Sequence, residues 1–481
     1  MWKLKPGING EDGRAKARLC VRNFKTDVND EVFAPVCRIE AVRMLMSELA
    51  VHPDWTMCHV DVCNAFCTAP LEKPIYIHPP EGMIQDDPTL AGKFLQVNNA
   101  LYGLACSPRA FNQHLHKRLE SYGWNASPVD HCLYTRTDSH GTSFVLCYVD
   151  DLLAIGCDAH ITEFRKKINV DTNPDSGFKV RDYGPPTSFL GMDIERSQHT
   201  VTLSQHTYIQ QLAERFKVSD GKHPATPLPP GTKMTAFDDE PVLSNPTEFR
   251  EVVGSLMYAS HCCRCDVAHA VHQLSRYLHA PRQAHLTLAL GVVRYLVRFD
   301  KIGLRYDGNN PSPLVGYSDA DWAGDVTTRR STSGYVFLRN NAAVSWASKL
   351  QKTVAHSTSD AEYRALSESQ RENQYLRNLE SIITGKHDLD PTVLHEDNMG
   401  AKKWTENPSN HNKTKHIEIC FHSVREQIGK TLKVVYCKTR DMLADPFTKA
   451  LEAPAFARLF KSIFGSGTGL HKDNAPEQGG C

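Results

Sequence analysis

The sequence offers little support for a membrane protein or for a protein built from repeats. Its apolar runs are short and are interrupted by charged residues, so none is long enough to span a bilayer. No tandem period or low-complexity tract appears along the 481 residues. The length and the apolar content instead predict several globular domains, each with a core of its own.

An excess of positive charge is also missing, because 55 Lys and Arg residues balance 55 Asp and Glu residues. A neutral net charge gives no indication of nucleic-acid binding, but a chain that is neutral as a whole can still carry a local basic patch. Between Ala401 and Arg440, nine Lys or Arg residues stand against three Glu residues. This local excess suits the phosphate backbone of a nucleic acid, with a solvated helix face as the alternative.

Disulfide pairing is not expected either. The fifteen cysteines are diluted in a long chain, form no regular pairs and follow no signal peptide. They therefore predict reduced thiols and an intracellular, cytoplasmic protein. The cluster Cys262-Cys263-Arg264-Cys265 lacks the spacing of a structural zinc site.

What the sequence does contain is a pair of adjacent carboxylates, Asp150 and Asp151, between two apolar runs. The pattern over residues 144–156 predicts a buried β-hairpin with the pair at its turn. Adjacent carboxylates repel each other and resist desolvation unless a cation lies among them, and Mg2+ prefers oxygen ligands. A solvated hairpin tip is the alternative, since Asp is common in turns. Asp61, at the end of another alternating strand, is either a further ligand or a cap.

A second set of acidic residues follows in the C-terminal third. Its members lie at the end of a short strand, in a long helix, at the end of a later strand and at the start of a late helix: Asp319, Glu362, Asp397 and Asp445. Two further strands between the first two members form a meander. Each carboxylate alone could be an ordinary surface acid, and only the ordered set of four is informative.

Five ordered segments resemble the reverse transcriptases of Ty1/copia-type LTR retrotransposons. In chain order they are Phe33-Ala34-Pro35-Val36, Asp61 with Phe66, Leu101-Tyr102-Gly103-Leu104 with Ser107-Pro108-Arg109, Tyr148-Val149-Asp150-Asp151, and Phe189-Leu190-Gly191-Met192-Asp193-Ile194. A Tyr-x-Asp-Asp motif alone would be a weak signal, whereas five segments in this order are a specific one.

The resemblance implies a polymerase site in which Asp61, Asp150 and Asp151 hold two Mg2+ ions, with Mn2+ as a substitute. It implies an RNA template, a DNA primer and dNTPs as partners. The residues implied to contact the dNTP or the template are Lys16, Arg18, Phe66, Tyr102 and Arg109. The residues implied to form the primer grip are Phe189, Leu190, Gly191 and Met192.

The C-terminal carboxylates resemble the acidic tetrad of RNase H in its copia-type version. This resemblance implies that Asp319, Glu362, Asp397 and Asp445 bind two further Mg2+ ions and cleave the RNA strand of an RNA–DNA hybrid. Thr414-Lys415-His416-Ile417 is a further signature of that version.

The predicted fold class is a multidomain α+β and α/β protein, with reverse-transcriptase palm, fingers and thumb followed by an RNase H-like domain. The expected domains are fingers and palm, a linker with the thumb or connection, the RNase H-like domain and a disordered tail: residues 1–216, 217–310, 311–452 and 453–481. A helix is expected over residues 201–216. No membrane partner is expected, and the sequence implies no oligomeric state.

Two other interpretations stay open. The chain could be a degenerate or co-opted retroelement fragment that binds nucleic acid without polymerising, which the residues Cys63, Ala105 and Cys106 favour. It could also be an active RNase H with an inactive polymerase. No zinc knuckle, protease motif or integrase core precedes the fingers, so we expect a mature-like fragment or the reading frame of a truncated copy. In an active element it would lie in a virus-like particle.

Overall fold

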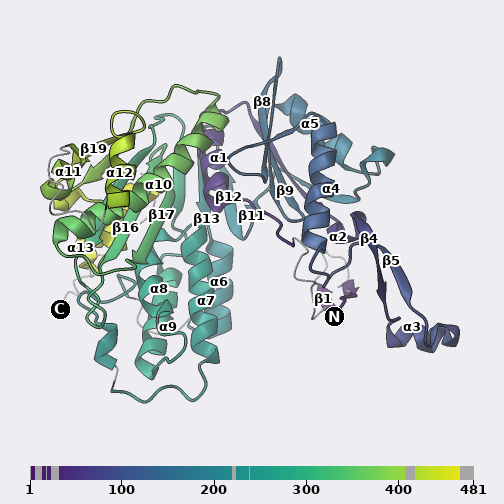
Figure 1. Cartoon of the computed structure of the whole chain (residues 1–481), viewed down its shortest axis with the longest axis horizontal. Helices are drawn as coiled ribbons and strands as arrows, with labels where there is room; N and C mark the ends of the chain where they lie inside the picture. The colour runs from purple at the N-terminus through teal and green to yellow at the C-terminus, as the bar shows by residue number, and fades with distance from the viewer. Residues whose placement is uncertain are drawn as a thin grey trace, which may run out of the picture. The chain divides into compact units, whose positions relative to one another are not determined.

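The computed structural model describes residues 2–5, 14–17, 19–22, 32–218, 224–237, 239–406 and 418–465. Figure 1 labels its helices and strands. The chain forms two compact units. Unit 1 comprises Met1–Arg38 and Asp54–Pro186, and unit 2 comprises Ile39–Pro53 and Thr187–Cys481.

Unit 1 is built on an antiparallel six-stranded sheet with the order β10-β3-β9-β8-β7-β6. Its central strands are buried along almost their whole length, as their continuous apolar runs predict. The strands of this sheet are β3 (Thr56–Val62), β6 (Asn125–Ala126), β7 (Leu133–Asp138), β8 (Gly141–Tyr148), β9 (Asp151–Gly156) and β10 (Val180–Gly184).

Two longer helices accompany this sheet. Helix α4 (Ser107–Ser121) buries Phe111, Leu115 and Leu119 at four-residue spacing, which is the spacing of one helical face. Helix α5 (Asp158–Ile168) follows β9 and packs against β9 and β3. The smaller elements of unit 1 are β1 (Trp2–Lys5), β2 (Arg14–Ala17), α2 (Ala65–Thr68), β4 (Pro70–Ile77), α3 (Glu81–Asp86) and β5 (Leu95–Asn99).

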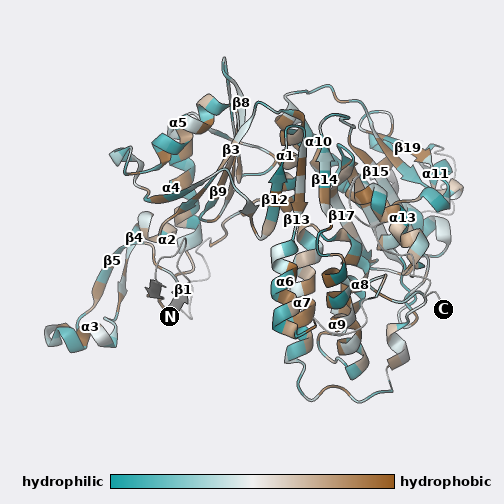
Figure 2. Cartoon of the chain, turned by 180° about the vertical axis from the view of Figure 1, so that it is seen from behind, coloured by the Kyte–Doolittle hydropathy of each residue, from teal (hydrophilic) through white to brown (hydrophobic). Residues whose placement is uncertain are grey.

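Unit 2 contains a four-stranded antiparallel sheet with the order β11-β12-β13-β14. Helix α1 (Ile39–Val51) packs against β13 and β14, and helices α6 to α9 pack against one another. Figure 2 shows both brown and teal bands along α6 and α7, as amphipathic helices require. These elements are β11 (Ser188–Phe189), β12 (Met192–Arg196), β13 (Thr200–Ser204), β14 (Gly303–Asp307), α6 (His206–Phe216), α7 (Thr247–Cys262), α8 (Ala268–Ser275) and α9 (Gln283–Arg298).

A second sheet of unit 2 has five strands in the order β17-β16-β15-β18-β19. Strands β15, β16 and β17 form the predicted antiparallel meander, and β18 and β19 add to β15 in parallel. The long helix α10 packs on β15 and β16. These elements are β15 (Val315–Asp321), β16 (Thr332–Arg339), β17 (Ala342–Leu350), α10 (Thr358–Thr384), β18 (Thr392–Glu396), α11 (Met399–Glu406), α12 (Glu418–Gln427), β19 (Leu432–Tyr436) and α13 (Ala453–Phe464).

The mixed architecture confirms the predicted fold class, but the unit boundaries differ from the predicted domains. Residues 39–53 and 187–216, expected in the first domain, belong to unit 2. Strand β13 pairs with β14, which follows it by about a hundred residues in the chain, and residues 200–204 are therefore strand and not part of the expected helix. The helix of that region begins only at His206.

Arg43 of α1 shows why that helix belongs to unit 2. Its guanidinium donates to the carbonyl oxygen of Val344 at 2.8 Å and to that of His261 at 2.8 Å. The same group lies 3.8 Å from the ring centroid of Trp346. Because the side chain is buried, these hydrogen bonds must replace the water that it loses on folding.

The predicted disordered tail is wrong for its first part. Residues 453–464 form helix α13, and the helix buries five apolar side chains: Phe456, Leu459, Phe460, Ile463 and Phe464. Their spacing of three and four residues places them on one helical face, which packs on β14 and β17. In the part of the chain that the structure describes, no helix has the length and apolar character needed to cross a membrane.

Candidate active sites

The predicted hairpin of unit 1 is formed by β8 and β9, with Tyr148 paired to Asp151 and Val149-Asp150 as its two-residue turn. Val149 adopts a φ of 57°, which is unusual for a β-branched residue. The carboxylates of Asp150 and Asp151 are partly exposed, so their charges can reach solvent or a bound cation. The turn therefore presents two carboxylates at one end of a buried hairpin.

Asp61 lies beside this turn because β3 is the neighbour of β9. In the antiparallel register Asp61 is the direct partner of Asp151, and the backbone N–H of Val62 donates to the carbonyl oxygen of Asp150 at 2.9 Å. The three predicted ligands thus come from two chain segments that meet at one place in the sheet. Carboxylates gathered from separate segments are what a two-metal site requires.

Two basic side chains that sequence reasoning missed accompany these carboxylates. Nε2 of His59 lies 3.0 Å from Oδ1 of Asp151. Arg181 of β10 is the register partner of Asp61. The pKa of Arg181 is raised by a hydrogen bond with Tyr183 and, more weakly, by the charge of Asp61. Only the pairing of β10 with β3, which joins segments far apart in the chain, reveals this neighbour.

The residues predicted to contact the dNTP gather around α2 and the start of α4. The ring centroids of Phe66 and Tyr102 lie 5.1 Å apart, and Phe66 also contacts Phe111 at 6.2 Å. Arg109 lies in the first turn of α4 and is partly buried. The structure therefore brings Phe66 and Tyr102 together, and their contact with a dNTP stays a prediction.

Glycine is required at position 103 of this segment. The carbonyl oxygen of Tyr102 accepts a hydrogen bond from the N–H of Val21 at 2.7 Å. Gly103 has a φ of 93°, and a Cβ there would lie 2.1 Å from the carbonyl oxygen of Val21. Lys16 lies in β2, where its register partner is Lys3. Arg18 lies outside the described residues.

The motif segments of unit 1 also meet at a small cavity of about 70 Å³. It is lined by Ala34, Pro35 and Val36 of the first motif and by Val149 of the turn. Pro108 and Phe111 of α4 line it from another direction. Segments spread over more than a hundred residues thus adjoin the Asp150–Asp151 turn.

The predicted primer grip is a tight hairpin of unit 2. Phe189 and Met192 pair at the ends of β11 and β12, and both side chains are buried. Leu190 and Gly191 form the turn with φ values of 47° and 65°. The hydroxyl of Tyr258 in α7 donates to the carbonyl oxygen of Leu190 at 2.5 Å and so holds the turn against that helix.

The second predicted site is assembled by parallel pairing in the five-stranded sheet. Tyr317 of β15 and His395 of β18 are register partners, and their rings stack at a centroid distance of 4.5 Å. Asp319 and Asp397 each follow these partners by two residues, so the register brings them to the same end of adjacent strands. Asp319 lies within β15, two residues before its end, and not at the end as predicted.

The other two carboxylates come from segments that pack on β15 and β16, namely α10 and the short helix at Asp445. The side chain of Ser357 caps α10 by accepting a hydrogen bond from the N–H of Asp360 at 3.1 Å, and Glu362 follows in the next turn. Asp445 begins a short 3-10 helix, and not the longer helix that was expected. The Thr448 hydroxyl donates to Oδ2 of Asp319 at 2.5 Å and to the carbonyl oxygen of Asp445 at 3.0 Å.

These carboxylates form two overlapping groups in which one oxygen of each residue lies within 4.8 Å of the others. The first group is Asp319, Asp397 and Asp445, and the second is Glu362, Glu396 and Asp397. Asp61, Asp150 and Asp151 form no such group, although all three belong to the described residues. Their carboxylate oxygens, taken one from each residue, do not all lie within 4.8 Å of one another. The four predicted acids of the second site therefore converge, with Glu396 as a fifth member that the sequence did not single out.

Burial and mutual repulsion raise the pKa values of four of these carboxylates, namely Asp319, Glu362, Glu396 and Asp445. Burial is the largest cause for Asp319, whose pKa rises to about 7, and the charge of Asp445 adds to it. Burial also raises the pKa of Glu362, and the charge of Glu396 acts in the same direction. Five carboxylates this close are stable together only if protons or cations neutralise part of their charge. An all-oxygen set of this kind fits a hard divalent cation such as Mg2+.

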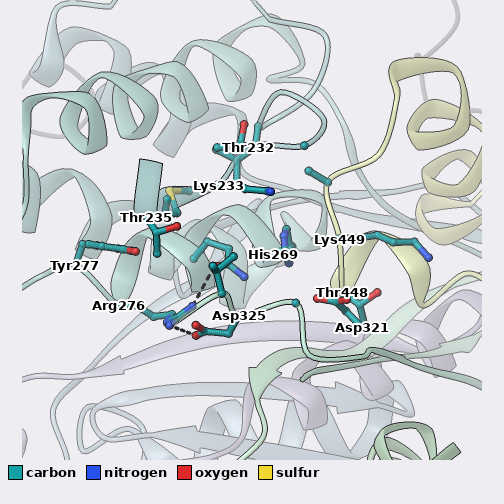
Figure 3. Close-up of a pocket in the computed structure, with 17 residues that line it drawn as sticks. Thr232, Lys233, Thr235, His269, Arg276, Tyr277, Asp321, Asp325, Thr448 and Lys449 are labelled. Atoms are coloured by element: carbon teal, nitrogen blue, oxygen red, sulfur yellow. Dashed lines mark hydrogen bonds and ion pairs between the residues drawn. The ribbon is translucent and has the colours of Figure 1, made fainter. Parts of the chain in front are cut away.

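A cavity of about 270 Å³ adjoins this cluster. Figure 3 shows Lys233 and Thr235 on one side of the cavity and Arg276 on the other, with Thr448 at one end. Thr448, which donates a hydrogen bond to Asp319, connects the cavity to the cluster, whereas none of the five carboxylates is in the lining. The segment at residues 228–235, expected to be an exposed linker, forms part of its lining.

Two other sequence features have different outcomes. Cys262, Cys263 and Cys265 are buried, and burial raises the pKa of each thiol, to about 11 for Cys262. Protonated thiols in a core act as small apolar groups. The segment Thr414-Lys415-His416-Ile417 lies outside the described residues.

Comparison with known proteins gives one family model and a set of relatives. Residues 1–230 match the model described as "Reverse transcriptase (RNA-dependent DNA polymerase)". The Pol polyprotein of transposon RE1 from Arabidopsis thaliana is 34% identical over 468 residues, which are 96% of this chain and 31% of that protein. The Pol polyprotein of transposon TNT 1-94 from Nicotiana tabacum is 34% identical over 97% of this chain and 35% of that protein.

A putative transposon Ty5-1 protein from Saccharomyces cerevisiae is 30% identical over 313 residues, which are 64% of this chain and 99% of that protein. A solved foamy viral protease–reverse transcriptase in complex with double-stranded DNA aligns with a TM-score of 0.45 and 13% identity. That alignment covers 91% of this chain and 65% of the viral chain. This chain spans about a third of the length of the two plant polyproteins.

Proposed function

Since the chain belongs to the Pol family of Ty1/copia-type retrotransposons, we propose that it is an RNA-directed DNA polymerase that also cleaves the RNA strand of RNA–DNA hybrids. Its substrates would be an RNA template, a DNA primer, dNTPs and the resulting hybrid. The observation that carries the polymerase is the register in which Asp61 faces Asp151 beside the Asp150 turn. The observation that carries the nuclease is the convergence of Asp319, Asp397 and Asp445.

At the polymerase site, Asp61, Asp150 and Asp151 would hold two Mg2+ ions, which stabilise the charge on the attacking and leaving oxygens of nucleotidyl transfer. Phe66, packed on Tyr102, would present a fixed aromatic face to the sugar of the dNTP. The turn at Leu190 and Gly191 would hold the primer end, and its hydrogen bond to Tyr258 would keep that turn in one place.

At the nuclease site, Asp319, Glu362, Asp397 and Asp445 would hold two further Mg2+ ions. Thr448 fixes the orientation of the Asp319 carboxylate through its hydroxyl. The raised pKa values of Asp319, Glu362 and Asp445 make these three carboxylates poor at keeping their full charge without cations. Metal binding would therefore release protons from the cluster. The adjoining cavity, with Lys233 and Arg276 in its lining, would contact the phosphate backbone of the hybrid.

A second candidate is a nuclease whose polymerase no longer works. It is favoured by one difference between the sites, because the nuclease carboxylates converge within 4.8 Å and the three polymerase carboxylates do not. Partly exposed aspartates can close around a cation when it binds, since their side chains are free to rotate, so this difference does not by itself remove the polymerase.

Primer extension on an RNA template with Mg2+ tests the polymerase. The wild-type chain is expected to extend a labelled DNA primer, and the Asp150→Asn chain is expected to extend it at least about a hundredfold more slowly. Extension by the wild type that does not exceed that of the variant would reject the polymerase and leave the nuclease. Cleavage of a preformed hybrid by wild type and by Asp397→Asn tests the nuclease in the same way.

A further inference from the structure

Glu396 is a buried carboxylate immediately before the predicted ligand Asp397. It is the last residue of β18 and is 0% exposed. Because side chains alternate along a strand, it lies on the same buried face as Leu394. Its Oε1 accepts a hydrogen bond from the N–H of Asn398 at 3.0 Å. Its Oε2 is buried and has no hydrogen-bond partner in the described part of the chain.

Glu362 repeats this arrangement from α10. Its side chain is 6% exposed, and its Oε2 is also buried without a hydrogen-bond partner among the described residues. One oxygen each of Glu362, Glu396 and Asp397 lies within 4.8 Å of the others. The two unpartnered oxygens therefore belong to one cluster, and one comes from helix α10 and the other from strand β18.

At the other end of the cluster, one oxygen each of Asp445 and Asp319 has a hydrogen-bond donor. Lys449 donates to Oδ1 of Asp445 at 2.9 Å, and Thr448 donates to Oδ2 of Asp319 at 2.5 Å. A buried carboxylate oxygen without a partner is unfavourable, because it has lost its water and gained no other donor, so the Glu362 and Glu396 end requires a partner. A shared proton would supply it, and so would a cation.

We propose that Glu396 is a direct ligand of a divalent cation held by Glu362, Glu396 and Asp397. This ion lies beside a second one held by Asp319, Asp397 and Asp445, and Asp397 contributes to both. Oxygens bound to one Mg2+ at about 2.1 Å are at most about 4.2 Å apart, and the three oxygens lie within 4.8 Å of one another with no ion among them. The proposal deepens the nuclease assignment and rests on it.

Counting bound Mn2+ ions tests this role without measuring activity. The full chain carrying Asp61→Asn and Asp150→Asn serves as the reference, because the polymerase site then contributes no tight ion. Free Mn2+ is measured by electron paramagnetic resonance at increasing total Mn2+, and Mg2+ is added to displace it. The reference is expected to bind two ions. Adding Glu396→Gln is expected to leave one, or to weaken the second by at least about tenfold.

The matched control is Glu406→Gln, which removes an exposed carboxylate on α11 that pairs with Lys402. It is expected to bind two ions like the reference. Circular dichroism establishes that each variant is folded. If Glu396→Gln does not fold, Glu396→Asp replaces it. This change keeps the negative charge but shortens the side chain by a methylene group, which moves the carboxylate away from the ion. Glu396→Asp is then expected to bind the second ion more weakly than the reference.

Unchanged binding of both ions in the Glu396→Gln chain would overturn the proposal. A Gln amide can donate to Glu362 in place of a shared proton, so that result would assign the pair to proton sharing. Binding at reference affinity in Glu396→Asp, where that variant is used, would also overturn it. Adding Asp397→Asn to the reference distinguishes a failure of the role of Glu396 from a failure of the whole nuclease metal site. If it abolishes binding and Glu396→Gln does not, only the role of Glu396 fails; if it changes nothing, the nuclease metal site fails as well.

Discussion

Nζ of Lys449 donates a hydrogen bond across 2.9 Å to Oδ1 of Asp445, which lies four residues earlier in the chain. The pair places an ammonium group beside the nuclease carboxylates. Burial alone would lower the pKa of Lys449, but the charges of Asp319 and Asp445 outweigh it and raise that pKa. In the absence of divalent cations, Lys449 is therefore a stabilising charge for the cluster.

Replacing this lysine should make the chain more dependent on divalent cations. Lys449→Met is expected to destabilise the cation-free chain by about 1 kcal/mol at neutral pH, because the pair is partly exposed. Mg2+ should then raise the melting temperature of the variant more than that of the wild type. Lys386→Met, at an exposed position after α10, is the control. Equal Mg2+-dependent shifts in wild type and Lys449→Met would contradict this account.

The turn of the polymerase hairpin stores backbone strain at Val149. A β-branched residue at a φ of 57° costs about 1–2 kcal/mol, whereas Asn tolerates this region. Val149→Asn is expected to stabilise unit 1 by about 0.5–1 kcal/mol in urea unfolding. Val149→Ile keeps the β-branch and should give no gain. A loss of stability in the Asn variant, similar to that of a random surface change, would argue against strain at this turn.

The primer-grip turn depends on the contact between Gly191 and Tyr258. A Cβ at position 191 would lie 2.3 Å from the Tyr258 hydroxyl oxygen, so Gly191→Ala is expected to destabilise unit 2 by about 2 kcal/mol and to slow primer extension. Tyr258→Phe removes the clashing oxygen together with one hydrogen bond and should cost about 1 kcal/mol. The double variant should be more stable than the sum predicts. Strict additivity would show that the two residues do not interact.

Two histidines of α8 should make unit 2 sensitive to acid. Burial lowers the pKa of His269 to about 4 and that of His272 to about 4, from an ordinary value of 6.5. Between pH 6.5 and 4 the unfolded chain binds protons that the folded chain does not. Stability is therefore complete above pH 6.5 and falls with pH below it, by at most about 1.4 kcal/mol per pH unit for each histidine.

Melting temperatures at pH 7.5 and 5 measure this effect. A chain with His269→Gln and His272→Gln is expected to lose less stability on acidification than the wild type. His387→Gln changes an exposed histidine and should leave the wild-type pH dependence in place. The interpretation is wrong if the double variant and the wild type lose the same number of degrees.

Features set by near neighbours in the chain could be predicted from the sequence. The β8–β9 hairpin follows from two apolar runs around a two-residue turn, and the start of α10 follows from the cap at Ser357. The spacing of Phe456, Leu459 and Phe460 also contained the signal for α13. The polar and small residues after Gly465 obscure this signal when residues 453–481 are taken as one tail.

Features set by pairing between distant segments could not be predicted from the sequence. The place of α1 in unit 2 depends on Arg43, whose carbonyl partners lie more than 200 residues further along the chain. The roles of Glu396 and Thr448 depend on the parallel register of β15 and β18 and on where the chain returns near Asp445. No local pattern in the sequence predicts the register of β15 with β18 or the approach of the Asp445 segment to β15.

The most direct test of the account follows both strands in one reaction. A DNA primer with one label is extended on an RNA template with another label, in Mg2+, by the wild type, Asp150→Asn and Asp397→Asn. The account predicts that the wild type lengthens the DNA and fragments the RNA. Asp150→Asn should neither lengthen the DNA nor fragment the RNA in this reaction, but it should still cleave a preformed hybrid. Asp397→Asn should lengthen the DNA and leave the RNA intact. Fragmentation of the RNA by Asp397→Asn, or extension by Asp150→Asn at the wild-type rate, would contradict it.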